Sequence, residues 1–141
     1  MSANTQMPFR KIEHVGIAVR DLDEAVSRYE QMMGTRCYKR DTVETEGVET
    51  AFFRTGESKI ELLASLRDDS PVARFLEKRG EGVHHLAFEV DDIHKEMERC
   101  RELGYTLLSE SPKPGADNKL VAFLHPKEHH GVLIELCQEI T

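Results

Sequence analysis

Residues 82–92 read Gly82-Val83-His84-His85-Leu86-Ala87-Phe88-Glu89-Val90-Asp91-Asp92, and this stretch decides the fold because the chain contains an earlier version of it. The earlier version is His14-Val15-Gly16-Ile17-Ala18-Val19-Arg20-Asp21-Leu22, with the same opening histidine, apolar positions and closing aspartate. A second matching pair follows, Lys59-Ile60-Glu61-Leu62-Leu63 and Leu133-Ile134-Glu135-Leu136-Cys137. Internal similarity of this kind indicates two fused copies of one module.

Length and composition are typical of a globular protein. The chain has 141 residues, of which 39% are hydrophobic and 32% charged, so we predict a single domain over residues 1–141. No apolar run approaches the ~18 residues of a membrane-spanning helix, and the N-terminus lacks an apolar signal core. We therefore expect a cytoplasmic protein with no membrane partner. The net charge of −7 argues against nucleic-acid binding.

The first module is expected over residues 10–66 as a βαβββ unit. Alternating apolar residues around His14 predict a strand, and apolar residues at helical spacing between Asp21 and Gly34 predict an amphipathic helix. Turn residues then separate three expected strands, at about 36–42, 48–54 and 58–64. A linker helix is predicted at about 70–80, with Ser70 as its cap and Pro71 in its first turn.

The second module, at about 81–141, repeats the same plan. A strand ending at Val90 and a helix ending at Gly104 correspond to the first two elements of module one. Three strands are expected at about 106–109, 120–124 and 132–137. Residues 111–118 contain two prolines and are expected to form a polar turn that cannot occupy the centre of a sheet.

Each module supplies one histidine near the start of its first strand and one glutamate within its last. A glutamate inside an apolar strand is costly to bury unless a cation meets it. A pseudo-twofold axis between the modules would bring together two imidazoles and two carboxylates without a thiolate, a set that suits Co²⁺, Mn²⁺, Ni²⁺, Fe²⁺ or Zn²⁺. The sequence thus predicts one metal site, formed by His14, Glu61, His85 and Glu135.

Each of these residues taken alone has a simpler explanation, since a strand histidine is often a core residue and a strand glutamate is often solvated. Recurrence of the pair at equivalent places favours the metal site, because neither packing nor solubility requires it. His84 competes with His85, but the register with His14 selects His85. Strand alternation places neighbours on opposite faces, so His84 is expected to flank the site as a partner of a ligand.

A second cluster, formed by His125, Glu128, His129 and His130, lies in a proline-containing turn. It lacks the spacing and the helical support of a metal-binding motif. We expect a solvated turn here rather than a second metal site.

Several segments together resemble one known family. They are Gly16-Ile17-Ala18-Val19, Glu46-Gly47-Val48, Lys59 to Leu63, Ser70 to Leu76, Gly82 to His85, Phe123 to Lys127 and Gly131 to Leu136. In this order and spacing the chain resembles the methylmalonyl-CoA epimerase family of the vicinal oxygen chelate superfamily. The resemblance implies an α+β fold in which two tandem βαβββ modules form a cupped eight-stranded mixed sheet around a divalent metal ion. Its metal ligands correspond to His14, Glu61, His85 and Glu135.

The implied reaction interconverts (2R)- and (2S)-methylmalonyl-CoA, which requires proton transfer on both faces of Cα. Glu135 is the expected base on one face, acting also as a metal ligand. Many bacterial relatives have a glutamate where this chain has Thr50, whereas the glutamate here is Glu49, one position earlier. Alternation would turn Glu49 to the opposite face, so either a bulge in the strand makes Glu49 the second base or a different residue is the base.

The resemblance also implies an acyl-CoA substrate and a homodimer. Lys113, Lys119 and Lys127 are the expected contacts for the CoA phosphates, although solvated lysines explain them equally well. Three other functions remain open: a glyoxalase I-type lyase with a similar ligand set, an extradiol dioxygenase, and a drug-binding resistance protein without metal.

Overall fold

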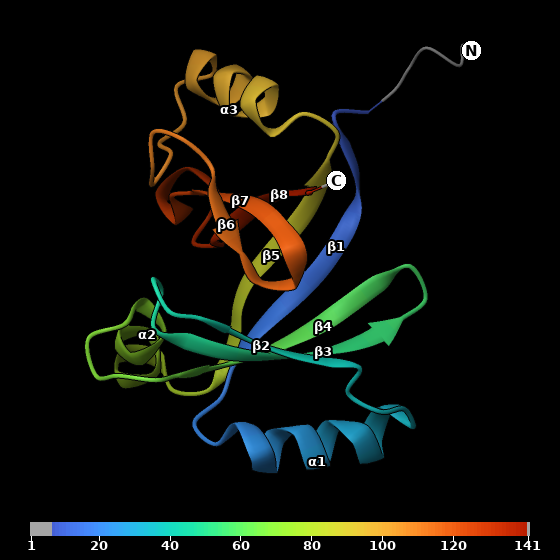
Figure 1. The fold of residues 1–141 in the computed structure, drawn as a ribbon. Coiled ribbons are helices and arrows are strands. Elements are labelled where there is room, and N and C mark those ends of the chain that lie inside the picture. Colours follow the sequence, from blue (N-terminus) through green and yellow to red (C-terminus); the bar gives the residue numbers. More distant parts are fainter. Residues whose placement is uncertain (1–6, 141) are drawn as a thin grey trace.

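All strands join one sheet in the computed structural model, which describes residues 7–140 (Figure 1). The first half supplies β1 (Phe9–Ala18), β2 (Lys39–Val43), β3 (Val48–Thr55) and β4 (Ser58–Ser65). The second half supplies β5 (Gly82–Val90), β6 (Lys113–Gly115), β7 (Lys119–Leu124) and β8 (Ile134–Glu139). The predicted eight-stranded mixed sheet is thereby confirmed.

The strand order is β2-β3-β4-β1-β5-β8-β7-β6, which has the same pattern when read from either end. β1 pairs in parallel with β4, and β5 pairs in parallel with β8. The two halves meet where β1 and β5 run antiparallel at the centre of the sheet. This arrangement is the pseudo-twofold relation that the duplicated sequence predicts, and Figure 1 shows the two halves curling toward one another.

Each of the three helices in the described part of the chain begins after a polar capping residue. Asp21 caps α1 (Leu22–Met33), Ser70 caps α2 (Pro71–Arg79) and Asp92 caps α3 (Ile93–Glu102), each by accepting a backbone N–H of the first turn. Apolar residues of α1 pack on β3 and β4, and those of α3 pack on β7 and β8 (Figure 1). Because these clusters occupy the outer face of the sheet, its inner face is left to line a central cup.

One edge of the sheet differs from the prediction. Leu107 makes only an isolated bridge to Leu124, and bends over residues 108–111 interrupt the strand expected at 106–109. The edge strand is instead β6, inside the segment expected to be a turn. Pro114 is tolerated there because an edge strand does not need every backbone N–H for pairing.

Between residues 7 and 140, no helix is long and apolar enough to cross a membrane. The three cysteines are free, and Cys100 and Cys137 are buried as expected of small core residues.

Candidate metal and acyl-group site

The four predicted metal ligands lie on the four central strands of the sheet. His14 is on β1, Glu61 on β4, His85 on β5 and Glu135 on β8, and none is more than 5% exposed. Two small residues organise the set. Gly16 is the cross-strand partner of both Glu61 and His85, and Ala87 is the partner of both His14 and Glu135.

The functional atoms of the four side chains converge on one point. The Nε2 atoms of His14 and His85 are 3.0 Å apart. Glu61 Oε1 lies 3.2 Å from each of these nitrogens. Glu135 Oε1 lies 3.6 Å from that of His14 and 3.1 Å from that of His85. The four-residue cluster predicted from the repeat is therefore assembled in the structure.

These spacings fit a bound cation. A metal held at about 2.1 Å places neighbouring ligand atoms about 3.0 Å apart in an octahedral site and about 3.4 Å apart in a tetrahedral one. Suitable ligand atoms of His14, His85 and Glu135 all lie within 4.8 Å of one another. Glu61 Oε1 completes the set through its two 3.2 Å distances. Nitrogen and carboxylate oxygen donors without a thiolate suit a borderline or hard divalent ion.

Gly16 makes room for one of the ligands. A Cβ atom at this position would lie 2.1 Å from Cε1 of His85 and 2.4 Å from its Nδ1. The backbone of Gly16 has no unusual φ value, so the requirement is for space rather than for conformation. The imidazole of His85 therefore lies directly over β1, at a position where only glycine leaves enough space for it.

Two β-bulges shape the site, and sequence alternation did not predict them. The pairing of β1 with β5 shifts between Ile12 and His14, and again beside Gly16. The first shift leaves Glu13 as an extra residue on β1, and the second leaves His84 as an extra residue on β5. Each extra residue thereby lies beside the ligand histidine that follows it and also lines the cup.

The bulged residues fix the orientation of the ligands. Glu13 Oε1 accepts a hydrogen bond from Nδ1 of His14 at 2.6 Å, and Nδ1 of His84 lies 3.0 Å from Nδ1 of His85. Burial, together with the charge of His85, lowers the pKa of His84 to about 4. A neutral His84 can accept the Nδ1–H of His85. With both Nδ1 atoms used in this way, each Nε2 presents its lone pair to the common point.

The charges of the cluster are mutually dependent. Burial alone would raise the pKa of Glu61 and Glu135, but hydrogen bonds and the charges of His14 and His85 outweigh burial and lower both. Burial likewise opposes protonation of the two histidines, yet the carboxylates raise the pKa of both. Two buried carboxylates thus draw two positive charges into the site, which protons or one divalent cation can supply.

A cavity of about 320 Å³ opens over this cluster. Val48, Thr50 and Phe52 of β3 line one wall, whereas Glu49 is not among the lining residues. The pairing of β3 with both of its neighbours is regular, so it lacks the bulge that would turn Glu49 inward. The structure consequently does not bring Glu49 to the other predicted site residues.

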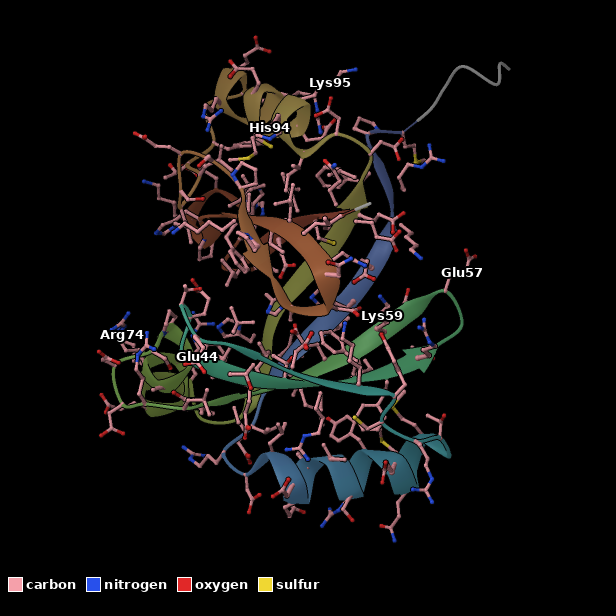
Figure 2. The ribbon with its side chains drawn as sticks, in the orientation of Figure 1. Glu44, Glu57, Lys59, Arg74, His94 and Lys95 are labelled. Carbon is pink, nitrogen blue, oxygen red and sulfur yellow. The ribbon has the colours of Figure 1, made fainter. Side chains whose placement is uncertain are left out.

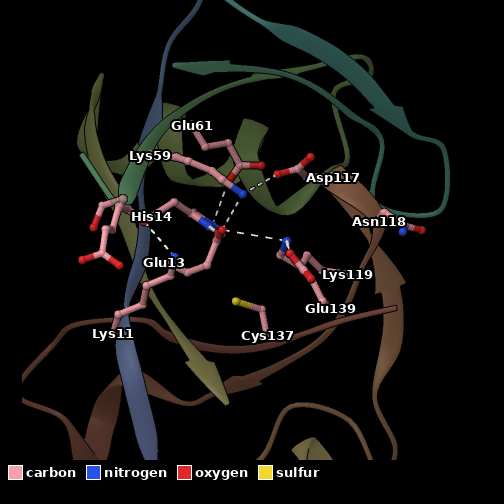
Figure 3. Close-up of polar contacts among 12 residues, drawn as sticks. Lys11, Glu13, His14, Lys59, Glu61, Asp117, Asn118, Lys119, Cys137 and Glu139 are labelled. Carbon is pink, nitrogen blue, oxygen red and sulfur yellow. Dashed lines mark hydrogen bonds and ion pairs between the residues drawn. The ribbon is translucent and has the colours of Figure 1, made fainter. Parts of the chain in front are cut away.

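A buried ionic network holds Glu13, the hydrogen-bond partner of His14, in place. Lys59 pairs with Glu13 and, at 2.8 Å, with Asp117 of the 3₁₀ turn η1 (Ala116–Asn118), so it links the first half to the second (Figure 3). Figure 2 shows Lys59 lying between the two halves, whereas Glu57 points outward. Burial opposes the charge of Lys59, but Asp117 and Glu13 raise its pKa. The sequence did not predict this network, because strand alternation places Glu13 on the face opposite His14 and only the bulge turns it inward.

The three predicted CoA-binding lysines lie in different surroundings. Lys113 is exposed and lines the cavity. Lys119 is 4% exposed, with its Nζ 3.5 Å from Glu139 and 3.9 Å from Glu13 (Figure 3). Lys127 is exposed in the short turn η2 (Pro126–Glu128) and does not line the cavity. Lys119 therefore already has carboxylate partners within the protein.

Within residues 7–140, the second histidine cluster does not bring three potential ligand atoms as close together as those of His14, His85 and Glu135. Glu128 accepts hydrogen bonds from the backbone and hydroxyl of Thr106, at 3.0 and 2.9 Å. The ring of His129 packs against Tyr105. These contacts make the segment a structural turn rather than only a solvated one.

A cupped sheet with two histidines and two glutamates at its centre is the arrangement of a class of small proteins with a metal site. Comparison with known protein sequences gives the same class. A model of the glyoxalase/bleomycin resistance protein/dioxygenase superfamily matches residues 13–123, and the chain belongs to this superfamily. An ethylmalonyl-CoA/methylmalonyl-CoA epimerase of Cereibacter sphaeroides is 42% identical over 130 residues, covering 91% of this chain and 97% of that protein.

Solved structures of epimerases have the same fold as this chain. The methylmalonyl-CoA epimerase of Mycobacterium tuberculosis superposes with a TM-score of 0.92 at 34% identity, covering 100% of this chain and 94% of that one. A variant of the Streptomyces coelicolor methylmalonyl-CoA epimerase, in complex with 2-nitronate-propionyl-CoA, has a TM-score of 0.89 at 36% identity, with coverages of 94% and 99%.

Proposed function

We propose that this protein is a methylmalonyl-CoA epimerase, which interconverts the 2R and 2S forms of its substrate. The observation that carries the proposal is the convergence of one histidine and one glutamate from each half, with the two Nε2 atoms 3.0 Å apart beneath a cavity. The epimerase relatives, 34–42% identical over at least nine-tenths of the chain, support the choice of substrate.

Glu135 is the group that we propose to remove the proton from Cα. It is ionised in the folded protein because His14 and His85 lower its pKa against the effect of burial, so one of its oxygens can accept a proton. When bound by the four ligands, a divalent ion supplies Lewis-acid stabilisation of the enolate oxygen. The largely apolar walls, which include Val48, Phe52 and Leu63, keep water away from the reacting carbon.

The opposite face of Cα needs a second acid or base. A second base on β3 would have to line the cavity, but Thr50 lines it and Glu49 does not. A hydroxyl group such as that of Thr50 is not a base at neutral pH. The second acid or base is therefore a residue of the cavity lining other than Thr50.

Three finer assignments complete the proposal. The ion is Co²⁺, Mn²⁺, Ni²⁺ or Zn²⁺, because these accept mixed imidazole and carboxylate ligands. Lys113, at the cavity, and Lys127, outside it, are the proposed contacts for the CoA phosphates, since both are exposed. The chain acts as a homodimer, which sedimentation equilibrium can test.

Isotope exchange tests the proposal. The metal-loaded protein, incubated with (2R)-methylmalonyl-CoA in D₂O, should incorporate deuterium at Cα, and excess chelator should stop the exchange. Glu135→Gln should reduce the rate about 10²- to 10⁴-fold while leaving the circular dichroism spectrum unchanged. Glu139→Gln is the matched control, because Glu139 lies on the same strand but is exposed.

Full exchange in Glu135→Gln would contradict the role of this base. Turnover of the methylglyoxal–glutathione hemithioacetal, with no exchange into methylmalonyl-CoA, would instead establish the lyase alternative. Binding of a ligand by metal-free protein without turnover of either substrate would establish the resistance-protein alternative.

A further inference from the structure

Within residues 7–140, one buried side-chain polar atom has no hydrogen-bond partner, and it is Oγ1 of Thr50. The residue is 1% exposed, yet it lines the cavity above the metal-ligand cluster. An unpaired buried hydroxyl lowers stability, because it loses its bonds to water and gains none in the protein. Valine has the same shape and would fit the same strand without this loss, so packing alone does not explain the threonine.

The position of Thr50 relates the hydroxyl to the chemistry. Its partners across the sheet are Leu63 of β4 and Asp41 of β2, and the next inward-facing residue of β4 is Glu61. Thr50 is thus the diagonal neighbour of Glu61, a relation that places two side chains about 7 Å apart. A group bound beside the metal ligands and extending along this wall reaches the threonine.

The surroundings of Thr50 are apolar except for Asp41, its partner on β2, whose carboxylate accepts the backbone N–H of Asp117 and makes no hydrogen bond with the Thr50 hydroxyl. Val48 and Phe52 flank it on β3, and Leu63 lies opposite. Rotation about χ1 exchanges the methyl and hydroxyl positions, so the hydroxyl can turn toward an acceptor in the cavity. In such a wall an acceptor oxygen of the ligand has few competing donors, which strengthens the bond that Thr50 can offer.

We infer that Thr50 is a substrate-positioning residue whose hydroxyl donates a hydrogen bond to an acceptor oxygen of the substrate acyl group. The inference rests on the proposed epimerase function. The oxygen belongs either to the free carboxylate or to the thioester carbonyl, and both are acceptors of the same kind. The residue orients the acyl group over the metal ligands and transfers no proton itself.

Paired substitutions test this inference. Thr50→Val removes the hydroxyl and keeps the shape, and Thr50→Ser keeps the hydroxyl. We expect Thr50→Val to weaken calorimetric binding of methylmalonyl-CoA by roughly 10- to 100-fold, with an unchanged or raised melting temperature. Thr50→Ser should bind within about threefold of the wild type. Thr55→Val, at the exposed end of the same strand, is the matched control and should change neither quantity.

Propionyl-CoA, which lacks the free carboxylate, separates the two acceptors. If Thr50→Val weakens methylmalonyl-CoA but not propionyl-CoA, the acceptor is the carboxylate, and if it weakens both equally, the acceptor is the thioester oxygen. Wild-type affinity in Thr50→Val, or a fall in its melting temperature that accounts for lost binding, would overturn the inference. Failure of the wild-type protein to bind or exchange methylmalonyl-CoA would refute the proposed function instead, so the two failures are distinct.

Discussion

At the scale of single residues, the site depends on small side chains as much as on the ligands. Gly16 contacts no metal, yet its missing side chain is the space that the His85 imidazole occupies. Ala87 has the equivalent place in the second half, between His14 and Glu135. In each half, a small residue two positions after the ligand histidine therefore lies beneath the ligand histidine of the other half.

Substitution of Gly16 by alanine should displace His85. The added Cβ would lie 2.1 Å from the ring, so we expect a loss of about 1–3 kcal/mol in the free energy of unfolding and a 10- to 100-fold fall in Co²⁺ affinity. Urea denaturation and metal titration measure these effects. In a His85→Ala background, Gly16→Ala should leave the free energy of unfolding nearly unchanged, because the imidazole that the added Cβ would clash with is absent. Unchanged metal affinity in the single variant would contradict the steric account.

At this scale, the sequence predicted the ligands and His84 as a partner of His85, but not Glu13 as a partner of His14. Recurrence identified His14, Glu61, His85 and Glu135 because the repeat marks equivalent positions. Glu13 and His84 were missed as inward-facing residues, since strict alternation assigns neighbours to opposite faces and bulges break it. The one available signal was that a polar residue precedes each ligand histidine.

At the scale of elements, the short turn η1 connects the halves across the cup. Asp117 has a left-handed backbone conformation, with φ of 58°, and its backbone N–H donates to Asp41 of β2 at 2.8 Å. Its carboxylate pairs with Lys59 (Figure 3). It also pairs with Lys39 at 3.2 Å. Several partners therefore hold this strained turn of the second half against strands of the first.

Removal of this carboxylate should have a pH-dependent effect. Burial would raise the pKa of Asp117, but Lys59 and Lys39 lower it, so the folded protein favours the ionised form. Its stabilisation is present above the unfolded pKa of about 3.9 and is lost as the pH falls through the lower folded value. Asp117→Asn should cost about 1–3 kcal/mol at pH 7, and the difference from wild type should shrink below about pH 4.

Urea unfolding at several pH values measures this difference. Asp69→Asn is the control, because Asp69 pairs with Arg67 at the exposed surface and should contribute less than about 1 kcal/mol. An equal cost of Asp117→Asn at pH 7 and pH 3 would show that the ionised carboxylate is not what holds the turn.

Element boundaries were predictable where capping and periodicity are local. Asp21, Ser70 and Asp92 cap the helices that the sequence predicted. The edge strand β6 was not predicted, because its pairing with β7 depends on tertiary contacts that override the turn preference of two prolines. The link from Asp117 to Lys59 joins residues far apart in the chain and leaves no local pattern.

At the scale of the whole molecule, duplication explains why one site is formed from two halves. The strand order is symmetric about the β1–β5 pair, so each half brings its histidine-bearing and glutamate-bearing strands to the centre. The repeat in the sequence was enough to predict this convergence. It could not predict that the inward-facing residue of β3 is Thr50 rather than Glu49, since a possible bulge had to be excluded from the pairing itself.

The central claim is that both halves bind one shared cation, and anomalous diffraction from crystals of the Co²⁺-loaded protein tests it most directly. We predict one anomalous peak per chain, about 2.0–2.3 Å from Nε2 of His14, Nε2 of His85 and a carboxylate oxygen each of Glu61 and Glu135. A peak bonded to residues of only one half, or none near these side chains at full metal loading, would contradict it.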